Sequence, residues 1–301
     1  MSNIEKDVKW LNTEREKWLL LIVLSIIWGS SFILIKKSLT IYNPYEVGSL
    51  RILIAGIVLL PIALINIKKF PKKKLKWLIL AAISGNFIPM FLFPMAQKMV
   101  SSSIAGIINS MLPIMVIMVG ALFWKFETTK RQLIGVVISF SGACIIAFSN
   151  GSGGEIKLFP VLLLLFAVLL YAINVTTVKS KLQGISAKIL SSFVFSFVLL
   201  LPSLISLVLA GFIDDFKPDH HHFIGLAYVA ILSIFGTGLA MMLNYRLLNI
   251  ATPLFASTVT LLMPIVAIIW GVLDGEMLTL GQIIGGIVIV SGLLFLRAKK
   301  I

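Results

Sequence analysis

The sequence has a single cysteine, Cys144, so an intramolecular disulfide and a cysteine-cluster metal site are both excluded. Acidic residues are scarce as well: only 12 of the 301 residues are Asp or Glu, and none lies near the middle of a long apolar segment. The three histidines are consecutive, at 220–222, and their side chains diverge, so they make a poor metal site. Without a buried acid, a histidine pair or an activated nucleophile, the sequence predicts no metal, no cofactor and no enzyme.

Charge of either sign is rare, and apolar residues dominate. Charged residues make up 13% of the chain and hydrophobic residues 59%, with a mean hydropathy of +1.05. Soluble domains contain about 25% charged residues and at most about half apolar residues, so a soluble protein is excluded. Because runs of about 18 or more mostly apolar residues recur along the chain, the sequence indicates a polytopic membrane protein.

The net charge of +14 would suggest nucleic acid as the partner of a soluble protein. Here the lysines and arginines lie in short loops between apolar segments, where such residues set topology and contact anionic lipid headgroups. We therefore expect membrane lipids, and no nucleic acid, as partners.

The apolar segments number ten, which predicts an all-α membrane protein with ten transmembrane helices. Ahead of the first segment, Ile4, Val8 and Leu11 recur at helical spacing among charges. This pattern predicts that residues 1–17 form a short amphipathic helix on the cytoplasmic membrane surface. The ten segments are 18–36, 46–66, 75–97, 101–123, 131–149, 157–179, 186–211, 223–243, 251–272 and 278–297.

Loop charge predicts the orientation of the chain in the membrane. Of the 26 lysines and arginines, 20 lie in loops on one side, five lie in loops on the other, and Arg51 lies within the second segment. The positive-inside rule then places both termini in the cytoplasm, which requires an even number of spans, and ten satisfies it. We expect a multi-pass protein of a bacterial-type inner membrane.

The second half of the sequence repeats the first. Residues 132–135, Gln-Leu-Ile-Gly, match residues 282–285, Gln-Ile-Ile-Gly, at an offset of 150. Upstream, Pro113 matches Pro264 at an offset of 151. Five helices per half is an odd number, so the halves are expected to insert with opposite orientation, as in the inverted repeats of secondary transporters. The expected repeats are 18–150 and 151–301.

Three local patterns resemble a known family. These are Trp28-Gly29-Ser30-Ser31-Phe32 in the first segment, Leu50-Arg51-Ile52-Leu53 in the second, and a proline followed by Glu127 or Glu276 at the ends of the fourth and ninth. Together they resemble the drug/metabolite transporter superfamily, EamA branch, over essentially the whole chain. The resemblance implies ten helices, a central cavity between the halves, and movement of small molecules that range from amino acids to drugs.

Polar and aromatic residues in the middle of the segments are candidates for the wall of that cavity, because such groups replace the hydration of a cargo. Interhelical packing is the alternative for each of them. Ser30 and Ser31 cannot both face the lumen. In the third segment Phe87 and Phe91 share one face and Asn86 lies on an adjacent one, and either face could line the cavity. The candidate substrate-binding residues are Trp28, Ser30, Ser31, Asn86, Phe87, Phe91, Asn109, Tyr171, Asn174, Asn244, Tyr245 and Thr258.

Prolines inside the third, fourth and ninth segments predict bends. Each proline removes one intrahelical hydrogen bond, so these helices are expected to be kinked and able to flex. The predicted kink residues are Pro89, Pro94, Pro113 and Pro264.

Arg51 is the one basic residue well inside a segment, and we interpret it as a snorkelling residue of the outer leaflet, an external gate or a structural pair. With no acidic residue in mid-segment, we expect a cavity without formal charge and no carboxylate for proton coupling. Such a cavity suits neutral, zwitterionic or aromatic molecules, and cation–π contact with Trp28 or Tyr171 would also admit organic cations.

The sequence therefore predicts a secondary transporter, monomeric or weakly dimeric, that moves small organic molecules such as amino acids by alternating access. The alternatives are a channel-like facilitator and a transporter of sugars, nucleosides or organic cations.

Overall fold

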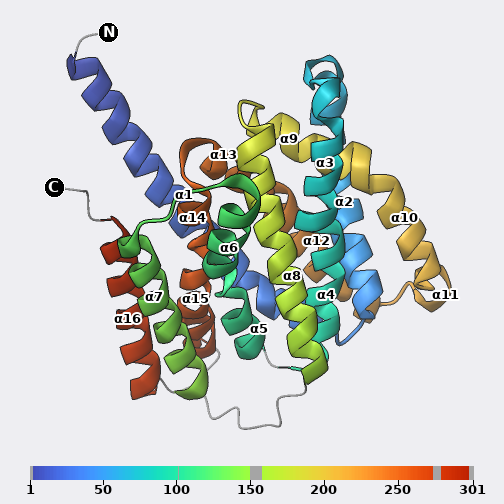
Figure 1. Cartoon of the computed structure of the whole chain (residues 1–301). Helices are drawn as coiled ribbons and strands as arrows, with labels where there is room; N and C mark the ends of the chain where they lie inside the picture. The colour runs from blue at the N-terminus through green and yellow to red at the C-terminus, as the bar shows by residue number, and fades with distance from the viewer. Residues whose placement is uncertain (1–2, 101, 150–157, 274–278, 298–301) are drawn as a thin grey trace.

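A computed structural model describes residues 3–100, 102–149, 158–273 and 279–297, and all regular structure in these residues is helical (Figure 1). Within these described residues, eight stretches are long and apolar enough to cross a membrane. The fifth and tenth expected segments coincide with two further helices, α7 and α16. The eight stretches are Asn12–Ser38, Pro44–Ile65, Lys72–Gln97, Ile104–Trp124, Leu158–Leu182, Ala187–Leu209, His220–Ile250 and Pro253–Trp270.

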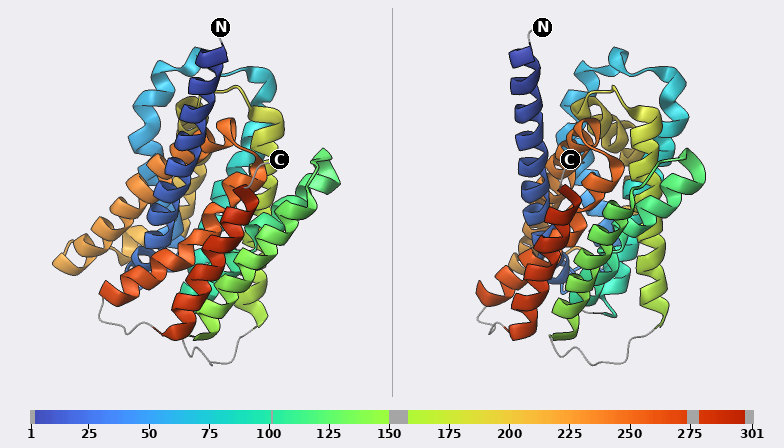
Figure 2. Two further views of the ribbon diagram at one scale, coloured as in Figure 1. Left: turned by 90° about the vertical axis from the view of Figure 1, so that its left-hand side faces the viewer. Right: turned by 60° about the vertical axis from the view of Figure 1, so that its left-hand side comes forward.

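Helix α1 is continuous from Asn3 to Ser38, and its first half stands away from the other helices (Figure 1), as two further views also let the reader follow (Figure 2). The prediction of a separate amphipathic helix over residues 1–17 is therefore wrong for the described part of that segment. The physical reason lies in the sequence: residues 3–18 contain no proline or glycine, so nothing interrupts the helical hydrogen bonds before the span begins.

Helix α2 (Pro44–Ile65) starts at a complete capping box. The Asn43 side-chain oxygen accepts hydrogen bonds from the backbone N–H groups of Tyr45 and Glu46, and Glu46 Oε2 accepts from the backbone N–H of Asn43 at 2.7 Å. Pro44 at the first helical position lacks the donor that would otherwise be unpaired. This cap fixes where α2 begins and therefore where Arg51 lies along it.

In the part of the chain that the structure describes, four of the spans contain a π-helical segment. The extra residue in each such turn rotates the following side chains around the helix axis, so the face presented to a neighbour changes along the span. The spans that contain them are α3–η3–α4 (Leu75–Ala82, Ile83–Phe87, Ile88–Gln97), α8–η4 (Leu158–Thr177, Val178–Leu182), α9–η5–α10 (Ala187–Phe193, Val194–Leu199, Leu200–Leu209) and α12–η6–α13 (His220–Ser233, Ile234–Leu239, Ala240–Ile250). Short elements complete this part of the chain: η1 (Ile67–Lys69), η2 (Lys72–Lys74) and α11 (Phe212–Asp215).

Two spans are interrupted where the helix axis breaks. The fourth divides into α5 (Ser102–Asn109) and α6 (Leu112–Trp124), and the ninth into α14 (Pro253–Ser257) and α15 (Val259–Leu273). The two spans meet near their interruptions, where the Ser110 hydroxyl donates to the Thr260 carbonyl at 3.1 Å.

The prolines lie close to these irregular points but do not all mark them. Pro89 is the second residue of α4, just past η3, and Pro113 is the second residue of α6, just past the break. Pro94 and Pro264 lie inside α4 and α15, which continue through them. The carbonyl four residues before Pro264 belongs to Thr260, which receives the Ser110 hydroxyl, so the acceptor that proline frees is satisfied.

Helices α7 (Lys130–Ser149) and α16 (Leu280–Arg297) lie side by side at one edge of the bundle and run in opposite directions (Figures 1 and 2). They approach through glycines: a Cβ on Gly142 would lie 2.6 Å from the Gly285 carbonyl oxygen, and one on Gly292 would lie 2.7 Å from the Gly135 carbonyl oxygen. Any side chain at these points would separate the two helices.

The starts of α7 and α16 share one capping pattern. At α7 the Thr129 N–H donates to Gln132 Oε1 at 2.9 Å and the Gln132 N–H donates to the Thr129 hydroxyl at 3.2 Å. Thr279 and Gln282 form the same two bonds, with the same distances, at the start of α16. The matched sequence positions thus adopt the same local structure.

Candidate functional site

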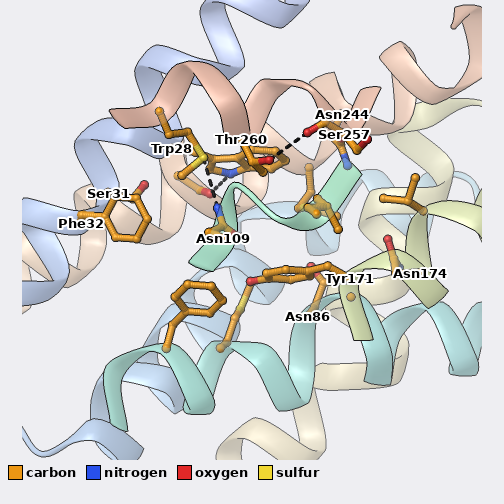
Figure 3. Close-up of a pocket in the computed structure, with 18 of the residues that line it drawn as sticks. Trp28, Ser31, Phe32, Asn86, Asn109, Tyr171, Asn174, Asn244, Ser257 and Thr260 are labelled. Atoms are coloured by element: carbon orange, nitrogen blue, oxygen red, sulfur yellow. Dashed lines mark hydrogen bonds between the residues drawn. The ribbon is translucent and has the colours of Figure 1, made fainter. Parts of the chain in front are cut away.

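A cavity of about 110 Å³ lies at the centre of the bundle, lined by residues from both halves of the chain (Figure 3). Its size is several times the roughly 10–15 Å³ needed for one water. Seven of the twelve candidate residues line it: Trp28, Ser31, Asn86, Asn109, Tyr171, Asn174 and Asn244. Polar residues that were not among the twelve candidates also line it, namely Arg51, Ser257 and Thr260.

Five candidates lie outside the cavity wall. Ser30 lies on another face of α1, where its hydroxyl accepts from Trp270 Nε1 at 2.7 Å. Thr258 is buried at the break before α15 and donates to the Phe255 carbonyl at 2.7 Å. Tyr245 is fully buried and lies beside the amides of Asn86 and Asn174, outside the cavity wall. The remaining two are Phe87 and Phe91.

One face of the third span meets the cavity. Asn86, Met90 and Phe93 line it. Phe87 instead lines a separate apolar groove between α3 and η5. Phe91 packs against α2, where a Cβ on Gly48 would lie 2.6 Å from its ring. Of the two faces left open by the sequence, the asparagine face therefore lines the cavity.

Trp28 joins the two halves. Its indole Nε1 donates to the carbonyl of Gly236, in η6, at 3.0 Å, while its ring lines the cavity. Ser31 donates to the Ile27 carbonyl of its own helix and lies against Gly236, where a Cβ would lie 2.8 Å from the serine hydroxyl. The π-helical turn of η6 thus provides an acceptor for α1, and Gly236 allows the close approach.

An aromatic row forms one wall of the cavity. The Phe32 and Phe93 rings are 6.5 Å apart, and the Phe93 and Tyr171 rings stack with centroids 5.8 Å apart and an interplanar angle of 30°. Such rings bury apolar surface and present π faces to a cargo. In Figure 3 Tyr171 lies across the cavity from Trp28.

The cavity amides are unequally satisfied. Asn174 Nδ2 donates to the Ala81 carbonyl at 2.7 Å, and Asn109 Nδ2 makes a weak bond to Met263 Sδ at 3.4 Å. The Asn109 oxygen and both amide atoms of Asn86 have no hydrogen-bond partner among the described residues. An unsatisfied buried polar group costs about 1–3 kcal/mol, so a water or bound molecule that reaches these atoms would be stabilised by them.

Arg51 lines the same cavity, so the expectation of a cavity without formal charge is wrong. Its side chain is only 8% exposed, and its guanidinium makes one long hydrogen bond, from NH2 to the Thr237 hydroxyl at 3.4 Å. The sequence left Arg51 open as a snorkelling residue of the outer leaflet, an external gate or a structural pair, and a lone arginine near the start of a span commonly snorkels. Burial by η6 overrides that tendency.

The sequence Gly236-Thr237-Gly238 is a signal that we did not use. Two glycines around a threonine in the middle of a span are unfavourable for a helix and favour close approach of another chain segment. Here that segment of η6 accepts hydrogen bonds from Trp28 in α1 and from Arg51 in α2. Ser257 and Thr260 are brought to the wall by the break before α15, which no sequence pattern marks.

Both ends of the bundle carry contacts between distant helices. At the end opposite η1 and η2, Tyr42 donates to the His222 carbonyl at 2.7 Å. Burial, with the nearby Glu46 and Asp219 carboxylates, raises the pKa of Tyr42 to about 12, so this donor stays protonated at neutral pH. At the other end, Arg246 donates from Nε and NH2 to both Glu16 carboxylate oxygens, at 2.6 and 2.8 Å.

Comparison with known proteins gives matches along nearly the whole chain. The EamA-like transporter family matches it twice, over residues 17–148 and 158–298. An uncharacterized transporter of Archaeoglobus fulgidus is 25% identical over 95% of this chain and 100% of its own length. The uncharacterized inner membrane transporter YedA of Escherichia coli K12 is 26% identical over 90% of this chain and 89% of its own.

A solved crystal structure has the same overall fold. It superposes with a TM-score of 0.72 and covers 93% of this chain and 95% of its own, at 15% sequence identity. The two family matches, the full-length transporter relatives and the apolar helices agree with one another: the protein is a membrane transporter, and the chain belongs to the EamA-like transporter family.

Proposed function

We propose that the protein is an inner-membrane secondary transporter that moves small organic molecules by alternating access, as a monomer or weak homodimer. The cargo is neutral, zwitterionic or aromatic, with amino acids as the leading class. The observation that supports this most is the central cavity, which is lined by amide, hydroxyl and aromatic groups from both halves. Those groups replace hydration, and the shared lining allows the two halves to bind one molecule between them.

The two halves act as inverted five-helix repeats in this proposal. Support comes from pairs related by the offset of 150: the Gly142–Gly285 contact corresponds to the Gly292–Gly135 contact with the two helices exchanged. Because α7 and α16 run in opposite directions, a two-fold axis between them would exchange the two helices and these two contacts. The equivalent capping boxes at the starts of these helices agree with this symmetry.

All ten helical segments cross the membrane in this proposal, with both chain ends in the cytoplasm. The lysine-rich elements η1 and η2 lie at the end of the bundle where α16 finishes (Figure 1). The positive-inside rule assigns that end to the cytoplasmic side.

Alternating access requires spans that bend near the cavity. The interruptions in the fourth and ninth spans, and the π-helical segments η3 and η6, all lie beside cavity-lining residues. Their backbone lacks the regular i to i−4 bonding of an α-helix, so they are the natural hinge points. As one end of the bundle opens and the other closes, the contact at the opening end would break. These contacts are Tyr42 with His222 at one end and Arg246 with Glu16 at the other.

Counterflow in proteoliposomes tests this function. Vesicles are loaded in turn with unlabelled L-phenylalanine, L-leucine, uridine or glucose, and the same compound is added outside in radiolabelled form. For the class of compound that is transported, the label should accumulate transiently inside the vesicles, and its initial rate should saturate with concentration. Replacing Trp28 with alanine removes a cavity wall and the bond to Gly236, so kcat/KM should fall about tenfold or more. Trp270→Ala is the matched control, because Trp270 also contacts α1 but lies outside the cavity.

A flux that rises linearly with concentration and shows no counterflow would support a channel-like facilitator instead. Equal loss of flux in the Trp28 and Trp270 variants would contradict the assignment of the cavity as the transport site.

A further inference from the structure

Arg51 carries the one positive charge among the residues that line the cavity, and no acidic residue lies with it. Three ion pairs occur among the described residues, and none of them includes Arg51. The acidic residue nearest to it in α2, Glu46, directs one carboxylate oxygen to the backbone of Asn43 at the helix start. The guanidinium charge is therefore uncompensated within the described part of the chain.

The guanidinium is also poorly satisfied as a hydrogen-bond donor. Arginine has five N–H groups in a planar fork. Arg51 uses one of them, in the 3.4 Å contact with Thr237, and its buried Nε has no partner. A buried unpaired charge is costly in a membrane protein and marks a functional site. The chemical group that fits a guanidinium fork best is a carboxylate, which accepts two parallel hydrogen bonds.

The rest of the wall limits what is attached to that carboxylate. A second anionic group would find no further lysine or arginine among the lining residues. The available groups are the unpartnered oxygens of Asn86 and Asn109 and the faces of Phe93 and Tyr171. These accept hydrogen bonds from an ammonium or hydroxyl group and pack against an apolar body.

We propose that Arg51 is the carboxylate-binding residue of the cavity and that the cargo is a small monocarboxylate, either a zwitterionic amino acid or a simple organic acid. This inference rests on the proposed function for its assumption that the cavity is the cargo site. It favours carboxylates over the sugars, nucleosides and organic cations that a cavity without charge would also accept.

Binding measurements on the purified full-length protein in detergent test this inference without requiring transport. The probes are matched sets: L-phenylalanine, 3-phenylpropanoate, L-phenylalaninamide and phenethylamine, with L-leucine and L-leucinamide as an aliphatic pair. Thermal stabilisation and quenching of tryptophan fluorescence are recorded at up to millimolar concentrations. At least one compound with a carboxylate should bind, and its carboxylate-free analogue should bind about 30-fold more weakly or not at all.

Variants assign the effect to Arg51. Arg51→Gln should weaken binding of the carboxylate about 30-fold or more while leaving the weak binding of the amide analogue unchanged. Arg51→Lys keeps the charge and should restore part of the affinity, although it loses the fork geometry. Arg131→Gln is the control, because Arg131 lies at the start of α7, outside the cavity wall, and donates to the Phe295 carbonyl of α16. The melting temperature without probe checks that each variant is folded.

The set of probes also distinguishes the two kinds of cargo, a zwitterionic amino acid and a simple organic acid. Binding of phenylalanine but not phenylpropanoate identifies a zwitterion, and binding of both identifies a general monocarboxylate; either supports the inference. It is overturned if no carboxylate binds, if amide and acid bind equally, or if Arg51→Gln retains full affinity for the acid. Saturable counterflow of an uncharged compound in that case would leave the transporter proposal intact.

Discussion

Replacing Gly285 with alanine is expected to lower the free energy of unfolding by about 3 kcal/mol, because α16 cannot make room for one methyl group. A Cβ at this position would lie 2.6 Å from Ile146 Cγ1, 2.7 Å from the Gly142 carbonyl oxygen and 3.0 Å from the Ile146 backbone nitrogen. Two of these three atoms are backbone atoms of α7, so relief requires the helices to move apart. The expected size is the upper part of the range for overpacking.

The adjacent Gly286 provides a matched control. A Cβ there would meet nothing within 4 Å, so Gly286→Ala should be neutral or slightly stabilising through its better helix propensity. Thermal and chemical unfolding of both variants in the same detergent make the comparison. Equal stability of the two variants would show that α7 and α16 are not in glycine-mediated contact.

Replacing Gly85 with alanine is expected to reduce kcat/KM for transport about 100-fold with little loss of stability. The new methyl group would overlap the Asn174 amide, which lies directly over Gly85 and donates to the Ala81 carbonyl. The amide is the flexible end of a side chain, so it would swing away, give up that bond and enter the cavity. Loss of the bond costs only about 1 kcal/mol of stability. The displaced amide in the space of the cargo raises the transport barrier by about 2–3 kcal/mol, or roughly two orders of magnitude in rate.

Gly106→Ala is the control for this prediction. Gly106 lies in α5 near the cavity, but a Cβ there would make only ordinary contact with the Phe32 ring at 3.9 Å. Counterflow rates and melting temperatures are measured for both variants. Unimpaired transport by Gly85→Ala would mean that the position of Asn174 does not matter to the cargo.

The helical bundle was largely predictable because membrane-length apolar runs leave few other structures open to the chain. The sequence match between residues 132–135 and 282–285 was also informative, because α7 and α16 begin with the same threonine–glutamine capping bonds. The continuous α1 was not predicted, because the change from charged to apolar residues near Trp18 suggested a boundary. A change in polarity is not a helix breaker, and none is present there.

The site was predicted in part, and the errors share one physical cause. Asparagine is expensive in lipid, so Asn86, Asn109 and Asn174 had to face inward, and all three line the cavity. Phe87 and Phe91 lie outside the cavity wall. One sequence leaves both faces of the third span open, because the neighbouring helices decide which of them meets the cavity.

Arg51 was misjudged for a related reason. What surrounds a residue near the end of a span depends on which neighbouring helix covers it, and here η6 contributes Thr237. The spacing of residues along a sequence shows only which side chains share a face of one helix. The residue that contacts the Arg51 guanidinium, Thr237, lies 186 positions away in the sequence.

Cysteine labelling tests the central claim, that one cavity between the halves opens to either side of the membrane. Cys144 is first replaced by serine, which removes the native thiol. Ser257→Cys then places one thiol in the cavity wall, and Ser192→Cys places one at a fully buried site outside it as a control. A membrane-impermeant thiol reagent is applied to right-side-out and to inverted vesicles.

The account predicts that the thiol at position 257 reacts in both vesicle orientations, while the thiol at position 192 reacts in neither. Reaction at position 257 from one side only, or from neither side, would contradict an alternating-access cavity.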